Sequence, residues 1–136
     1  METKKMIVID ATNATLGRLS SFAAKQALLG KQVIIVNCNK AVITGKKRTT
    51  IEDYKHKRRM GGSSLRGPNF PKNPERIVKR TVRGMLSYTQ QRGLDALKRV
   101  MCYNDVPKEF ENEKKIIAGK EKKTKVIGLE ELGREI

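Results

Sequence analysis

The stretch that decides the fold is MIVIDATNATLGRLSSFAAKQALLGKQVIIV, Met6 to Val36. Its first apolar run, Met6–Ile9, is rich in β-branched residues and predicts a buried strand. The polar turn DATNAT follows, and its Thr15 can cap a helix from about Leu16 to Leu29, closed by Gly30. Val33–Val36 predicts a second buried strand. A strand, helix and strand over so short a span form a βαβ unit with parallel strands and a right-handed crossover, so the fold class is α/β.

The remainder of the chain continues this pattern. The strongest helix start is Asn73 as N-cap, followed by Pro74 and by Glu75 in the first turn. The 136 residues are expected to form one domain, 1–136, in which residues 108–136 are a tail packing on the body or on partners. The expected elements are a strand at Ala41–Gly45, a basic helix from Thr49 or Thr50 to Arg59, helices at Pro74–Leu86 and Leu94–Arg99, and a strand at Val100–Tyr103.

The charge of the chain is large and localised. The formal net charge is +16, and residues 40–83, with fourteen basic and three acidic side chains, carry +11 of it. A concentrated field of one sign predicts a polyanionic partner. Cys38 and Cys102 lack metal-site spacing and are expected to be buried, reduced thiols. No apolar run has the length of a signal peptide or membrane span, so a soluble, intracellular protein is expected.

Nucleotide-binding and catalytic motifs fail at specific positions. The P-loop pattern would need glycine at Lys40 and a hydroxyl at Lys47, and the turn before the first helix has only one glycine, Gly17. Gly17 is more simply explained by close packing of the helix against the sheet or a partner. His56 is the only histidine and lies in a basic run, where a contact role is favoured over that of a general base. The sequence therefore predicts no enzyme activity, no metal and no cofactor.

Three further side chains could in principle carry chemistry. Ser63 and Ser64 lie in GGSSL, which lacks the closing glycine of a nucleophile elbow. Asp10 ends the first strand, where hydrogen bonding at the strand end is favoured over ligand binding. No small-molecule substrate is expected.

The basic residues form a coherent candidate site. On the helix after Asn73, four cations share one stripe, opposite a face of Ile77, Val78, Val82, Met85 and Leu86. KHKRRMGGSSLRGPNF, Lys55–Phe70, joins a basic run to glycines that let backbone N–H groups approach phosphates. The predicted RNA-binding residues are Lys46, Lys47, Arg48, Lys55, His56, Lys57, Arg58, Arg59, Gly61, Gly62, Ser63, Ser64, Arg66, Gly67, Arg76, Lys79, Arg80 and Arg83.

The composition also indicates the kind of nucleic acid. Aromatic residues make up 4% of the chain and tryptophan is absent, so stacking of splayed bases is not expected to be the main mode of binding. No helix-turn-helix pattern is present. Folded RNA, bound through phosphates and shape, is favoured. The alternatives are a nucleotide-binding α/β enzyme and a DNA-compacting protein.

Four segments together resemble the L-thirteen family of large-subunit ribosomal proteins. They are Met6–Lys47, MGGSSLRGPNF (Met60–Phe70), PERIVKRTVRGML (Pro74–Leu86) and RGLDALKRVMCYNDVP (Arg92–Pro107), and RTVRGML is the most specific block. The short link Gly30–Gln32 is typical of the archaeal and eukaryotic branch, and the short tail favours the archaeal one. Ser87 stands where many members have proline, and Lys79 where many have an aromatic residue.

The resemblance implies a three-layer α/β/α fold around about four mostly parallel strands, with basic loops and an extended C-terminal tail. It also implies a non-enzymatic protein of the cytoplasmic ribosome that supports subunit assembly and translation. Its partners would be large-subunit ribosomal RNA and neighbouring large-subunit proteins, with no membrane.

Overall fold

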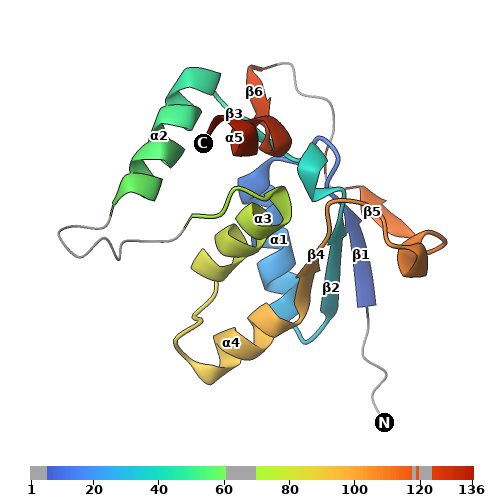
Figure 1. Ribbon diagram of the computed structural model, residues 1–136. Helices are drawn as coiled ribbons and strands as arrows, with labels where there is room; N and C mark the ends of the chain where they lie inside the picture. The colour runs from blue at the N-terminus through green and yellow to red at the C-terminus, as the bar shows by residue number, and fades with distance from the viewer. Residues whose placement is uncertain (1–5, 61–69, 118, 120–123) are drawn as a thin grey trace, which may run out of the picture.

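Four parallel strands form the central sheet of the computed structural model, which describes residues 6–60, 70–117, 119 and 124–136 (Figure 1). They are β1 (Met6–Asp10), β2 (Gln32–Val36), β4 (Val100–Cys102) and β5 (Lys115–Ile117), in the order β4-β2-β1-β5. β1 pairs with β2 in a register that sets Ile7 beside Val33 and Ile9 beside Ile35. The predicted α/β class and the parallel four-stranded sheet are confirmed.

Helix α1 (Leu16–Leu28) joins β1 to β2 and ends as the sequence predicts. Gly30 has φ +92°, its N–H bonds the Ala27 carbonyl at 3.0 Å, and the Lys31 N–H bonds the Gln26 carbonyl at 3.2 Å. These two bonds are the pair that defines a Schellman motif. Thr15 is the N-cap by position, but its side chain makes no capping hydrogen bond.

Gly30→Ala is expected to lower the free energy of unfolding by about 1–2 kcal/mol, because a Cβ disfavours a positive φ. Gly17→Ala is the matched control. A Cβ at Gly17 meets no atom within 4 Å, so close packing within the described residues does not explain this glycine, and alanine should raise stability by about 0.5–1 kcal/mol. Urea denaturation of both variants measures the two effects. Equal effects of the same sign would contradict this account of the cap.

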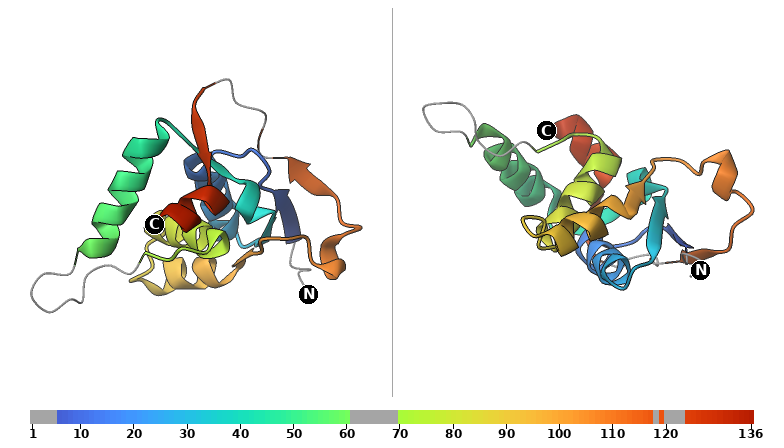
Figure 2. Two further views of the ribbon diagram at one scale, coloured as in Figure 1. Left: turned by 45° about the horizontal axis from the view of Figure 1, so that its top comes forward. Right: turned by 90° about the horizontal axis from the view of Figure 1, so that it is seen from below.

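The helices pack against one face of the sheet (Figure 2). α1, α3 (Pro74–Gly84), α4 (Gln91–Lys98) and α5 (Leu129–Glu135) share one buried cluster with Ile9, Val33, Ile35 and Val100. On the other face, Val8, Ile34 and Val36 pack with Phe110, which lies on the short 3-10 helix η3 (Lys108–Phe110). The second outer layer is therefore thin in the described part of the chain.

A second, two-stranded sheet holds the C-terminal segment. β3 (Val42–Thr44) pairs antiparallel with β6 (Val126–Gly128), so the predicted strand at Ala41–Gly45 is present but belongs to a different sheet. Ile127, Leu129 and Leu132 are fully buried. The last residues thus supply a strand and a helix to the body.

Helix α2 (Lys47–Arg59) stands beside this body (Figure 1). None of its residues is fully buried, and only Ile51 and Tyr54 reach the core. It begins two residues before the predicted Thr49, and α4 begins three residues before the predicted Leu94. In the described residues, every helix is too short or too polar to cross a membrane.

Candidate nucleic-acid interface

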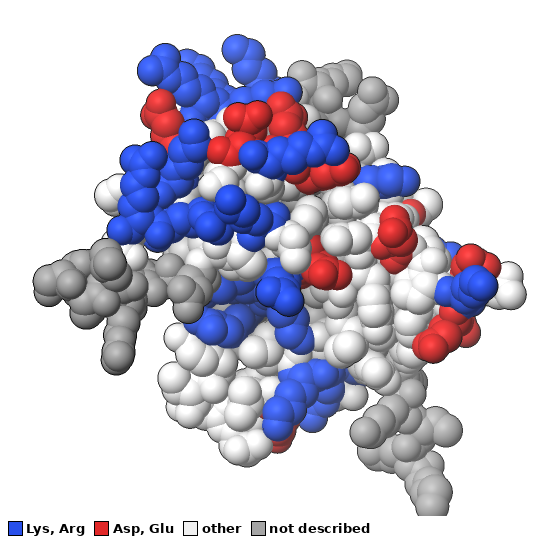
Figure 3. Space-filling model, viewed as in Figure 1, with Lys and Arg blue, Asp and Glu red and all other residues white. Residues whose placement is uncertain are grey.

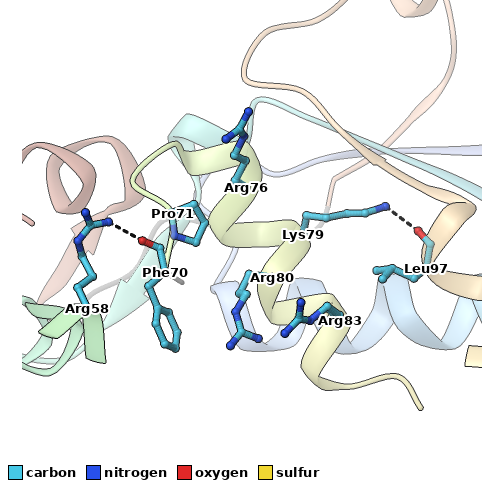
Figure 4. A pocket seen from close by; sticks show the side chains of 8 residues that line it. All are labelled: Arg58, Phe70, Pro71, Arg76, Lys79, Arg80, Arg83 and Leu97. Carbon is cyan, nitrogen blue, oxygen red and sulfur yellow. Dashed lines mark hydrogen bonds between the residues drawn. The ribbon is translucent and has the colours of Figure 1, made fainter. Parts of the chain in front are cut away.

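Helix α3 presents arginines outward because its apolar residues are fixed inward. Ile77, Val78 and Val82 are buried in the core, while Arg76, Arg80 and Arg83 project from the other side (Figure 4). Asn73 is the N-cap as predicted, yet the N–H of Glu75 bonds Asn104 Oδ1 at 3.1 Å, so a side chain from after β4 completes the helix start. The helix ends at Gly84, two residues before the predicted Leu86. Met85, expected on the packing face, is consequently exposed.

A concave surface, here called the α3 groove, runs across this helix. Its volume is about 490 Å³. Among the described residues, no acidic side chain lines it. The lining residues are Arg58, Phe70, Pro71, Arg76, Lys79, Arg80, Arg83 and Leu97 (Figure 4).

Aromatic rings hold several of these cations in place. The Arg80 guanidinium lies 4.8 Å from the centroid of the Phe70 ring, and Lys57 Nζ lies 5.6 Å from the same centroid. Tyr54 meets Phe70 edge to face with centroids 6.4 Å apart, and Arg58 donates a hydrogen bond to the Phe70 carbonyl. Phe70 thereby ties the last turn of α2 to α3. The Arg83 guanidinium lies 4.6 Å from the Tyr88 ring centroid.

Lys79 differs from its neighbours on the stripe. Its ammonium donates hydrogen bonds to the carbonyls of Leu97, at 2.6 Å, and of Val100. These carbonyls lie at and just beyond the end of α4, where a cation satisfies acceptors that the helix leaves open. Burial lowers the pKa of Lys79, and the nearby Cys102 acts in the opposite direction. The structure thus gives Lys79 a packing role between α3 and α4.

The cations of α2 fall into two groups. At its start, Lys47 Nζ lies 3.2 Å from a Glu131 carboxylate and Arg48 Nε lies 3.1 Å from Glu52. Lys46, at the N-cap, is exposed. In the last turns of α2, no described ion pair involves Lys55, Lys57, Arg58 or Arg59. These four cations and His56 lie at the C-terminal end of the helix, where the helix dipole favours positive charge.

These residues define one surface of the molecule. We call Lys55, Lys57, Arg58, Arg59, Arg76, Arg80 and Arg83 the cationic face. In Figure 3, blue atoms extend from α2 across α3, whereas red atoms lie mainly at the top and right of the view. Of the three ion pairs in the described residues, none includes a member of the cationic face. Gly61, Gly62, Ser63, Ser64, Arg66 and Gly67, also predicted to bind RNA, lie outside the described residues.

The aromatic residues of this surface were missed in the sequence. Tyr54, Phe70 and Tyr88 are three of only six aromatic residues, and all three contact cations. The low aromatic content of the whole chain argued against base stacking, but a whole-chain percentage does not show that these three residues lie next to the basic segments. The sequence did contain a signal for this placement. Tyr54 lies one helical turn before Arg58, and Phe70 ends the basic segment Lys55–Phe70.

Asp10 holds the loop between β1 and α1. Its Oδ1 accepts bonds from Thr12 N at 3.0 Å, Thr12 Oγ1 at 2.7 Å and Asn37 Nδ2 at 3.1 Å. The predicted strand-end role is confirmed. Burial raises the pKa of Asp10, but these hydrogen bonds outweigh burial, and the net result is a pKa below 3.8.

Asp10→Ala is expected to lower the free energy of unfolding at pH 7 by about 1–3 kcal/mol, the cost of leaving its donors unpaired. Because the pKa is lower in the folded state, this stabilisation is present above pH 3.8 and is lost as the pH falls through the folded value. Urea titrations at pH 7 and pH 3 should show the difference between wild type and variant shrinking at pH 3. A difference independent of pH would contradict the assignment.

The two cysteines are free thiols, as predicted. Cys38 is buried and Cys102 half-buried. Contact with the Cys102 thiol, together with burial, raises the pKa of Cys38. Cys38 Sγ also lies 3.7 Å from the Ile35 carbonyl. The thiols act as core packing groups.

The fold and this surface define a small, basic α/β protein with one face suited to a polyanion. The family model described as "Ribosomal protein L13" matches residues 4–109. The chain belongs to this family, which confirms the resemblance seen in the sequence. The family is structural and non-enzymatic.

Curated relatives cover most of the chain. "Large ribosomal subunit protein uL13" of Methanosarcina barkeri is 49% identical over 108 residues, 79% of this chain and 76% of the relative. The protein of the same name from Thermoplasma volcanium is 42% identical over 134 residues, 96% of this chain and 98% of the relative. That of Methanocaldococcus jannaschii is 41% identical over 134 residues, 96% and 97% of the two chains. These relatives are archaeal, in agreement with the predicted branch.

Proposed function

We propose that this chain is a structural component of the large ribosomal subunit that binds large-subunit ribosomal RNA and supports subunit assembly and translation. Its place is then the cytoplasmic ribosome, with neighbouring large-subunit proteins as further partners. Family membership supports the structural role. The cationic face supports the RNA contact.

The observation that carries the proposal is the absence of carboxylate partners on the described cationic face. Like charges three and four residues apart destabilise an isolated helix slightly, and Arg76, Arg80 and Arg83 have this spacing. RNA phosphates compensate that repulsion from outside the chain. The face supplies charge along two helices, which suits a folded backbone.

The predicted contact residues divide by their geometry. The cationic face, with Lys46 and His56, is proposed to contact RNA directly, and so is the glycine loop. Lys47 and Arg48 would first exchange their carboxylate partners, so they are proposed as weaker contacts. Lys79 is proposed to position α3 rather than to touch phosphate.

Filter binding of the full-length protein to large-subunit ribosomal RNA tests the proposal. Log affinity should fall with log salt concentration by about 0.7–0.9 per phosphate contact, so six contacts give a slope near −5. Sedimentation of a cell lysate should place the protein in the large-subunit peak. A slope near zero, equal affinity for plain DNA duplex, or absence from that peak would contradict it.

Lys79→Met and Arg76→Met should have opposite consequences. The first leaves two carbonyls without their donor and is expected to lower the free energy of unfolding by about 1–3 kcal/mol, with RNA affinity nearly unchanged. The second removes an exposed cation, so stability should change by less than about 0.5 kcal/mol while RNA affinity falls about fivefold, the value of one phosphate contact near 0.15 M salt. Urea denaturation and filter binding measure both. A larger loss of affinity for Lys79→Met would assign Lys79 to the RNA contact.

A further inference from the structure

The α3 groove has the size of a ligand site. Its volume of about 490 Å³ lies within the rough range of 300–1,000 Å³ for small-molecule pockets. An RNA duplex presents a convex ridge of phosphates, which covers such a hollow without filling it. One nucleotide turned out of its stack is small enough to enter it.

The groove offers planar groups on which a base can stack. The Phe70 ring backs the Arg80 guanidinium at 4.8 Å, and the Tyr88 ring backs the Arg83 guanidinium at 4.6 Å. Each ring lies within cation–π distance of its guanidinium, and both arginines line the groove. Bases of unpaired RNA stack on aromatic rings and on arginine planes. In Figure 4 the Phe70 ring and the Arg80 and Arg83 side chains point to the same side of α3.

Arg83 also has a hydrogen-bond donor, Nε, for which the described residues supply no acceptor. Its Nε is buried and makes no hydrogen bond within the described residues. Buried polar groups are nearly always hydrogen-bonded, so such an atom marks a place where a ligand acceptor is expected. Base carbonyls and ring nitrogens are acceptors of this kind.

We propose that the α3 groove binds one unpaired nucleotide extruded from large-subunit ribosomal RNA, its base against the guanidinium groups of Arg80 and Arg83. The Arg83 side chain would turn to bring its buried Nε to an acceptor of the base, and Arg58 and Arg76 at the rim would hold the flanking phosphates. The inference rests on the proposed function. It adds a base contact, which specifies sequence, to phosphate contacts, which only position the chain.

Photo-crosslinking from inside the groove tests this directly. Full-length protein carrying p-benzoylphenylalanine in place of Phe70 is bound to large-subunit ribosomal RNA and irradiated, and the attached RNA is sequenced. The expected crosslink is to one nucleotide that reacts with dimethyl sulfate in the protein-free RNA and is protected in the complex. Crosslinks spread along consecutive paired nucleotides would overturn the inference. A second protein, with the same amino acid in place of Arg59 on α2, should crosslink in either case; if it does not, the RNA-binding function itself fails.

Affinity and salt dependence separate stacking from phosphate contact. Phe70→Leu and Tyr88→Leu should each weaken binding about two- to fivefold, because the guanidinium that stacks on the base loses the ring that holds it. The salt slope should stay unchanged, because no phosphate contact is lost. Arg59→Gln should flatten the slope by about 0.7–0.9. Tyr88 is 43% exposed, so its replacement leaves the fold intact even if that of Phe70 does not. Wild-type affinity in the Tyr88→Leu variant would overturn the inference.

Discussion

Reversing Arg80 and Arg83 together to glutamate is expected to weaken binding to large-subunit ribosomal RNA by at least about 30-fold near 0.15 M salt. Loss of two cations from the RNA-facing surface accounts for about 30-fold and flattens the salt slope by about 1.4–1.8, and the new carboxylates repel the RNA further. The core should survive, because both side chains lie outside the buried face of α3, but each is half-buried and loses its contact with an aromatic ring. Filter binding over a salt series gives both quantities.

Lys25→Glu with Lys31→Glu is the matched control. It changes the net charge by the same amount, from +16 to +12, but these lysines lie at and just beyond the last turn of α1, outside the cationic face. Affinity should fall by less than about threefold. Equal losses in the two double variants would mean that net charge, rather than this face, determines binding.

Leu132→Ala is expected to lower the free energy of unfolding by about 2–5 kcal/mol, the range for a leucine deleted from a packed core. Leu132 is fully buried although only four residues follow it in the sequence. Its neighbours in the core include residues of α1 and α3. Loss of the α5 contact should therefore unfold the whole body more easily, as measured by urea denaturation.

Leu29→Ala provides the control for that result. It is the same chemical change at a side chain that is 65% exposed, and it should alter stability by less than about 0.5 kcal/mol. If Leu132→Ala were as mild as Leu29→Ala, the C-terminal segment would be an appendage rather than part of the core.

The first half of the fold was predictable because its signals are local. The β-branched run before DATNAT, the spacing of the apolar residues in α1 and the glycine after it act within a few residues of one another. The same holds for Asn73 and Pro74 at the start of α3. The errors there are two residues at a helix end: α2 begins two residues before the predicted Thr49, and α3 ends two residues before the predicted Leu86.

The C-terminal elements could not be predicted in the same way. Ile116 and Ile117, or Val126 and Ile127, are short apolar pairs among charges. They become strands only because β1 and β3, far back in the sequence, offer unpaired edges. Their partner strands lie some 80 to 110 residues away in the sequence. The residues around each apolar pair therefore do not predict the pairing.

The candidate site also has some features that the local sequence predicts and others that depend on residues far away in the sequence. Helical periodicity correctly set the arginines of α3 opposite Ile77, Val78 and Val82. It also grouped Lys79 with them, because periodicity cannot tell that the end of α4 supplies carbonyls at that position. The rings behind Arg80 and Arg83 likewise depend on where Phe70 and Tyr88 lie in space.

Crosslinking of intact large subunits by ultraviolet light, followed by digestion and mass spectrometry of the peptides that carry nucleotides, tests the central claim most directly. Peptides from residues 46–60 and 70–88, which hold the cationic face, should carry the nucleotides. Nucleotides attached instead to the acidic segment around Glu109–Glu113, with none on α2 or α3, would contradict the assignment of the RNA-binding face.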